Sequence, residues 1–161
     1  FIGIKLVIKP SDRTIMRSRA YAGEAVMTGL SGWDTGIPTA DMSPDELAPT
    51  RQDTLIWPQW GNHFETAGKA GQAPDTTEGK QLLKLNADWN AAKTAADRQK
   101  IWTQMLAIHA QQTFIIGTVS EVMQPVVVRK TLNNVPEKGV FSWDPGGQFG
   151  MYRMDEFWFS R

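Results

Sequence analysis

The sequence has no cysteine, only two histidines, no excess of charge and no long hydrophobic run. The absence of cysteine excludes disulfides, Cys-ligated zinc and catalysis by a thiol. The 17 Lys and Arg residues balance the 17 Asp and Glu residues, so the basic excess typical of a nucleic-acid-binding surface is missing. The apolar runs are also too short to span a bilayer. We therefore expect neither a nucleic-acid partner nor a transmembrane helix.

What is present indicates a single globular domain. The chain has 161 residues, the size of one ordinary domain, and 41% of them are hydrophobic, which is enough for a packed core. No signal peptide is recognisable, and the chain opens at Phe1 within what reads as structure. We interpret residues 1–161 as one unit that belongs to a longer protein.

Near the start of the chain, the pattern of apolar residues predicts a strand, a helix and a second strand. Apolar and polar residues mostly alternate over residues 4–9, which favours a half-buried strand. Asp12 can cap a helix that ends at Gly23. Residues 24–33 are short and apolar and read as the second strand. Two such strands side by side would be parallel, with a right-handed connection.

A long segment rich in proline and glycine follows, from about residue 33 to residue 77. Within it, Ser43-Pro44-Asp45-Glu46 predicts a short helix with Ser43 as its cap, and Pro49 forbids a long continuation. The rest reads as irregular. Irregular segments of this length in compact domains are usually functional or lie against another body.

Two helices are predicted next, over residues 77–92 and over residues 94–111, where Thr94 and Asp97 form a capping signal. Residues 113–120 and 124–130 read as extended segments. Turn signals follow at 133–139 and 144–147. We expect the aromatic tail to dock as a short strand or a clamp. The apolar stripes of the two helices consist of Leu82, Leu85 and Trp89, and of Ile101, Trp102, Met105, Ile108 and His109.

Few residues suggest catalysis or metal binding. His63 and His109 are the only histidines, and each could be a partly buried, hydrogen-bonded side chain or a functional group. The sequence contains neither a nucleophile elbow nor a phosphate-binding glycine loop. Asp34 and Asp41 remain as candidates for binding a cation. One hypothesis combines Asp34, Asp41 and His63 in a hydrolase, but otherwise we expect no enzyme activity, metal or cofactor.

The tryptophans are more informative. Trp33 ends the second predicted strand, and ligands in open α/β sheets gather beyond the carboxyl ends of strands. Trp57 and Trp60 stand three apart in the long irregular segment. They could contact a ligand, form the flat platform of a carbohydrate-binding module, or pack the segment onto its own domain. Trp89 and Trp102 lie on helix stripes, and we expect them in the core.

An ordered series of segments resembles one family along nearly the whole chain. The segments are "IGIKLVIKPSDR", "GEAVMTGLSGW", "PTADMSPDELAPT" with "WPQWGN", "NADWNAAKTAADRQKIWTQMLAIHAQQTFIIGTV" with Arg98 at a typical position, "LNNVPEKGVFSWD" and "DEFWF". Together they are similar to the C-terminal part of extracellular solute-binding proteins of bacterial ABC importers, of the peptide, nickel and opine type.

This resemblance implies an α/β fold. The chain would be a partial lobe of the type II periplasmic-binding-protein fold, with a mixed sheet flanked by helices and a long Pro-rich loop. The resemblance implies a monomeric periplasmic receptor whose two lobes close on a peptide, a peptide-like solute or an opine. The receptor would then deliver this solute to the permease subunits in the inner membrane.

In peptide-binding relatives, an Asp shortly after the Trp at the end of the second strand grips the amino group of the ligand. The best match here is Asp34, directly after Trp33. The usual Trp-x-x-Asp spacing is absent, so an opine, a sugar conjugate or an unusual peptide stays open as the ligand. The predicted ligand-binding residues are Trp33, Asp34, Trp57 and Trp60.

Overall fold

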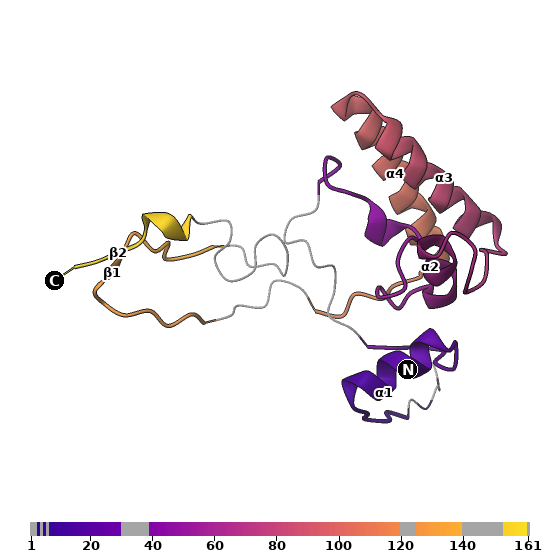
Figure 1. The fold of residues 1–161 in the computed structure, drawn as a ribbon, viewed down its shortest axis with the longest axis horizontal. Coiled ribbons are helices and arrows are strands. Elements are labelled where there is room, and N and C mark those ends of the chain that lie inside the picture. The colour runs from indigo at the N-terminus through magenta and orange to yellow at the C-terminus, as the bar shows by residue number, and fades with distance from the viewer. Residues whose placement is uncertain are drawn as a thin grey trace. The chain divides into compact units, whose positions relative to one another are not determined.

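The computed structural model describes residues 3, 5, 7–29, 39–119, 125–139 and 153–160. The chain divides into two compact units. The first, which we call the helical unit, comprises Phe1–Gly29 and Ser43–Phe114. The second, which we call the C-terminal unit, comprises Leu30–Met42 and Ile115–Arg161. Figure 1 shows helices α1 to α4 in the helical unit and strands β1 and β2 in the C-terminal unit.

Helix α1 spans Arg13–Tyr21 and confirms the predicted first helix. Its N-cap is Asp12, whose carboxylate accepts a 2.8 Å hydrogen bond from the backbone N–H of Thr14. Backbone hydrogen bonds from Thr14 and Ile15 lower the pKa of Asp12, because they favour the charged carboxylate. The helix ends before Gly23, whose positive φ of 76° suits glycine and reverses the chain.

Helices α3, Thr77–Ala91, and α4, Ala95–Gln112, form a packed pair and confirm the two predicted helices (Figure 1). Each begins with a threonine cap, because Thr76 accepts from the N–H of Gly79 and Thr94 from the N–H of Asp97, both at 3.1 Å. Their facing stripes form half of the buried hydrophobic core of the described residues, and Trp89, which the sequence predicts in the core, is only partly buried. The buried residues of this pair are Gly79, Leu82, Leu85, Asn86, Trp102, Met105 and Ile108.

A short 3₁₀ helix, η1, spans Asp45–Leu47 and matches the predicted short helix. The prediction that Ser43 caps it is wrong, since the N-cap is Pro44 and no side chain bonds there. Instead, the hydroxyl of Thr50 donates a 2.9 Å hydrogen bond to the carbonyl of Asp45 and closes the turn from the other end. Leu47 is fully buried, so η1 contributes to the core against α4.

Helix α2 spans Pro58–Glu65, within the segment that the sequence predicts as irregular. Proline suits the first turn of a helix because its missing N–H has no partner there in any case. Trp57, Trp60 and Phe64 also follow helical spacing. The prediction that this segment is irregular outside the short helix after Ser43 is therefore wrong for Pro58–Glu65.

The predicted strands are not found in the described residues. Residues 5, 7–9, 24–29, 115–119 and 125–129 carry no strand assignment. The large hydrophobic side chains of these segments are exposed, with Val26 at 99% and Val127 at 95%. A strand needs a neighbouring strand to pair its backbone groups, and none of these segments has one among the described residues. The mixed sheet and the type II lobe therefore stay predictions.

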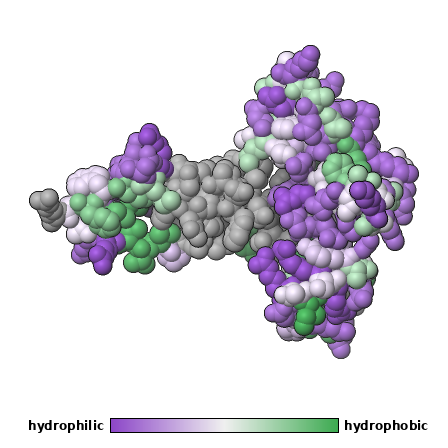
Figure 2. Space-filling view, viewed as in Figure 1, coloured by the Kyte–Doolittle hydropathy of each residue, from purple (hydrophilic) through white to green (hydrophobic). Residues whose placement is uncertain are grey.

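In the C-terminal unit, strand β1, Leu132–Asn133, pairs antiparallel with β2, Trp158–Phe159. Leu132 lies opposite Phe159, and a 3₁₀ helix, η3, Met154–Glu156, leads into β2. The prediction that the tail docks as a short strand is confirmed. Figure 2 shows hydrophobic surface around this hairpin, where Trp158 and Phe159 are exposed. Across the described ranges, no helix has the length and apolar character needed to cross a membrane.

Candidate functional site

The four predicted ligand-binding residues separate into two pairs. Trp33 and Asp34 lie outside the described residues. Trp57 and Trp60 lie in the helical unit, where Trp57 precedes the first turn of α2 and Trp60 falls within it. This spacing places the two rings on one side of the helix. Their centroids are 6.3 Å apart and their planes differ by 12°, so the two indoles stack.

Trp57 is a core residue with only 7% of its surface exposed. Its ring makes edge contacts with Phe114 at 4.9 Å and with His109 at 5.7 Å between centroids. The interpretation that Trp57 packs its segment onto the domain is therefore confirmed. A flat carbohydrate platform would need two exposed rings, and the burial of Trp57 removes one of them.

His109 links this aromatic group to η1. Its Nε2 lies 2.8 Å from the carbonyl oxygen of Leu47. A carbonyl only accepts, so Nε2 carries the proton and donates it to Leu47. Burial lowers the pKa of His109, and the bond to Leu47 opposes this only in part. His109 therefore acts as a neutral structural donor. This agrees with its interpretation as a partly buried, hydrogen-bonded side chain.

The ring of Trp60 packs against α3 at Gly79. A Cβ built on Gly79 would lie 2.8 Å from the six-membered ring of Trp60 and 3.1 Å from the side chain of Pro74. Gly79 therefore has no room for a side chain, because the indole occupies that space. Trp60 remains partly exposed, so one part of its ring packs on α3 while another part stays accessible.

A cavity of about 270 Å³ opens beside the two tryptophans. One side consists of the end of α1 and the segment after it, and the other consists of residues 55–60. No lining residue carries a charge. The lining residues are Ala20, Gly23, Ala25, Val26, Thr28, Leu55, Ile56, Trp57, Pro58, Gln59 and Trp60.

Two features fix the shape of this cavity. The side-chain amide of Gln59 donates a hydrogen bond to the carbonyl of Tyr21, which ties α2 to the end of α1. Leu55 has a positive φ of 59° and is buried on the wall. A left-handed conformation costs a branched residue about 1 to 2 kcal/mol. Such strain persists only where the surrounding structure enforces it, and it is common at ligand sites.

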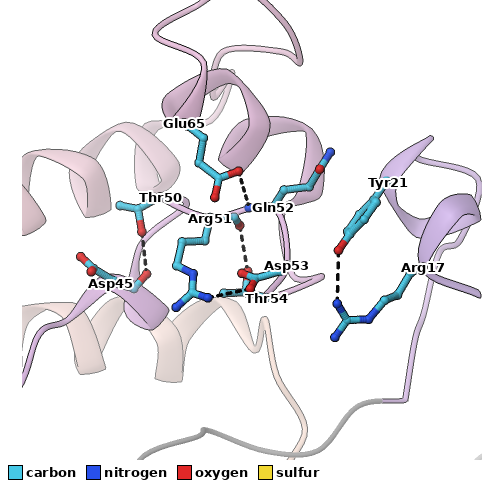
Figure 3. A network of polar contacts seen from close by, with 9 residues as sticks. All are labelled: Arg17, Tyr21, Asp45, Thr50, Arg51, Gln52, Asp53, Thr54 and Glu65. Atoms are coloured by element: carbon cyan, nitrogen blue, oxygen red, sulfur yellow. Dashed lines mark hydrogen bonds and ion pairs between the residues drawn. The ribbon is translucent and has the colours of Figure 1, made fainter. Parts of the chain in front are cut away.

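A polar network supports the segment that carries Leu55 (Figure 3). The guanidinium of Arg51 lies 2.6 Å from the carboxylate of Asp53, and this contact raises the pKa of Arg51. Glu65 on α2 accepts from the backbone N–H of Gln52 at 3.3 Å. The hydroxyl of Thr54 donates to the carbonyl of Arg51 at 3.2 Å. The bond to Glu65 ties this segment to α2, and the other two contacts fold residues 51–54 on themselves just before the strained Leu55.

The three proposed hydrolase residues do not all belong to one unit. Asp34 lies outside the described residues, Asp41 belongs to the C-terminal unit and His63 belongs to α2 in the helical unit. In the part of the chain that the structure describes, no group of three His, Cys, Asp or Glu side chains is placed to hold a metal ion.

Only one wall of the cavity had a recognised signal in the sequence. The pair of tryptophans marked one wall. The other wall, built from residues 20–28, was missed because its residues were assigned to a helix end and a strand. The small residues Ala20, Gly23 and Ala25 were the available signal, since small side chains beside an aromatic pair leave space.

Comparisons with protein families, with curated proteins and with solved structures find no significant match to this chain.

Proposed function

We propose that this chain is the C-terminal ligand-binding lobe of a solute-binding protein that serves a bacterial ABC importer. The receptor is a monomer that captures a peptide, a peptide-like solute or an opine in the periplasm. It delivers the solute to permease subunits in the inner membrane and performs no chemistry on it. This proposal rests on the ordered resemblance described above and on one observation from the helical unit.

That observation is the uncharged cavity beside Trp57 and Trp60. Ligand sites are typically concave, mostly apolar and largely formed before the ligand arrives. Trp57 is buried on this wall, and the surrounding structure holds Leu55 in a left-handed conformation, so we expect the wall to be rigid. A wall lined by uncharged residues suits a protein that binds a solute and releases it unchanged.

Closure of the two lobes would supply the affinity. A ligand that contacts both lobes favours the closed population, in proportion to the difference in its affinity for the two states. One lobe alone offers only part of those contacts. The isolated chain should therefore bind the whole solute much more weakly than the intact receptor does.

The test is thermal unfolding of the intact receptor in the presence of candidate peptides and opines. A ligand at a concentration 100 times its Kd should stabilise the folded state by about 2.7 kcal/mol. Trp33→Ala and Asp34→Ala should remove this gain, because the resemblance assigns the grip on the amino group to these residues. Trp158→Ala serves as the matched control, since this exposed tryptophan belongs to the C-terminal hairpin.

Two results would count against the proposal. Stabilisation that survives in both Trp33→Ala and Asp34→Ala would reject the assigned grip. A receptor that no peptide or opine stabilises would reject the function itself.

A further inference from the structure

We propose that the cavity beside Trp57 and Trp60 is a subsite for one uncharged aromatic group of the solute. This inference rests on the proposed function and concerns the helical unit alone. The occupant is a single ring system, such as the side chain of an aromatic amino acid.

The size of the cavity limits the occupant. Its volume of about 270 Å³ lies just below the range of pockets that enclose whole drug-sized ligands. A buried apolar cavity of about 150 Å³ is sufficient for benzene. The space therefore fits one side chain with one or two rings, but not a peptide.

The chemistry of the walls selects an uncharged group. No lining residue carries a charge that could form an ion pair with the solute. Transferring a charge into such a site without a partner carries a large desolvation cost. Two indoles instead favour a flat aromatic partner, because stacked or edge-to-face rings gain about 0.5 to 1.5 kcal/mol beyond simple burial.

One wall is fixed and the other is open to solvent. Trp57 and Leu55 are buried, and Trp60 is wedged against Gly79. On the opposite side, Val26 is 99% exposed and Thr28 is partly exposed, so an entering ring meets these residues first. Residues 24–29 form neither helix nor strand, so we expect this wall to adjust to the occupant.

The direct test uses indole as the probe and the 161-residue chain as the protein. Titration followed by two-dimensional NMR should show saturable shifts of the Trp60 indole N–H and of the Ala25 amide. The amide of Thr103, which lies on the exposed side of α4 away from the cavity, should not shift. Tryptamine and indole-3-acetate, which add one charge to the same ring, should bind at least about tenfold more weakly.

A matched pair of variants locates the binding. Ala25→Phe fills the cavity from its adjustable wall and should weaken indole binding by at least about tenfold. Ala73→Phe makes the same change at an exposed position that does not line the cavity and should bind indole as the wild type does. The shift map of the wild type gives an answer even if Ala25→Phe folds poorly.

Three outcomes would overturn the subsite: no saturable shift at millimolar indole, unchanged binding in Ala25→Phe, or equal binding of the charged analogues. Failure of the proposed function is a separate result. If indole binds at this cavity but no peptide or opine stabilises the intact receptor, the cavity is a ring-binding site and the importer function is rejected. If a solute stabilises the receptor and indole fails, only the subsite is rejected.

Discussion

At the scale of single residues, Gly61 shows how closely the candidate site is packed. It lies in α2, and a Cβ built on it would come within 2.2 Å of the backbone carbonyl of Arg51. Backbone atoms cannot move aside as a flexible side chain can. The segment that leads to Leu55 therefore depends on the absence of a side chain at this position.

Gly61→Ala should destabilise the protein by about 1 to 3 kcal/mol, the usual cost of overpacking. Helix propensity alone predicts the opposite sign, because alanine is favoured over glycine in a helix. Urea denaturation measures the difference. Gly29→Ala is the control, since no atom lies within 4 Å of its added Cβ. A Gly61→Ala variant as stable as the wild type would show that residues 51–52 do not pack on α2 as described.

His109 gives a prediction about pH. Burial lowers its pKa below the ordinary value of 6.5, so the unfolded chain takes up a proton more readily than the folded one. The stability that this residue contributes is complete above 6.5 and is lost as the pH falls through the lowered pKa. His109→Gln keeps a donor for the Leu47 carbonyl but does not titrate.

Between about pH 7 and pH 5, the wild type should therefore lose more stability than His109→Gln does. Unfolding midpoints measured across this range give the comparison. Parallel curves for the two proteins would contradict the placement of a neutral His109 beside Trp57 and Leu47.

At the scale of elements, the N-terminal caps stabilise the helices through residues that are close in the sequence. Thr94 accepts from the N–H of Asp97 at 3.1 Å and also donates to the carboxylate of Asp97 at 2.6 Å. Thr94→Ala should cost about 1 kcal/mol, because it leaves an N–H of the first turn without its partner. Thr103→Ala is the control within α4, since its hydroxyl only bonds back to the carbonyl of Gln99. Equal midpoints for the two variants in urea denaturation would contradict this capping role.

The difference between local and long-range interactions explains which elements can be predicted from the sequence. Helices α1, α3 and α4 were predicted, and α1 and α4 also with their caps Asp12 and Thr94, because a cap and an apolar stripe are set by residues a few positions apart. The strands were not found in the described residues, because pairing depends on neighbours that are distant in the sequence. Helix α2 was missed although Pro58 at its start and the spacing of Trp57, Trp60 and Phe64 were visible.

The candidate site divides in a similar way. Composition singled out Trp57 and Trp60, since paired tryptophans are unusual. The burial of Trp57 and the cavity beside it depend on contacts with Phe114, His109 and the end of α1. No local pattern encodes these contacts. The predicted grip at Trp33 and Asp34 lies outside the described residues and stays a prediction.

At the scale of the whole molecule, the two units differ in their cores. All the buried hydrophobic residues that the structure describes belong to the helical unit, including Leu47, Leu82 and Met105. The C-terminal unit presents an exposed two-stranded hairpin, and hairpins of this kind are marginally stable by themselves. In the 161-residue chain, backbone amides should therefore exchange most slowly in α3 and α4 and much faster in β1 and β2. Equal protection in hydrogen-exchange mass spectrometry would contradict this difference.

Several exposed segments of the molecule are hydrophobic. Residues 7–8, 26–27, 115–119 and 126–128 have the composition of strands but carry no strand assignment. In the proposed receptor, these segments would gain neighbours from the rest of the lobe. This is the arrangement that the resemblance implies for a mixed sheet flanked by helices.

We expect the intact receptor to carry a peptide-like or opine solute. Native mass spectrometry of the intact receptor, gently purified from a periplasmic extract, measures this directly. We predict a bound small molecule that gentle activation releases and whose fragments identify a peptide or an opine with an uncharged aromatic group. A receptor that retains no small molecule, and gains none when such peptides and opines are added, would not be the importer receptor that we propose.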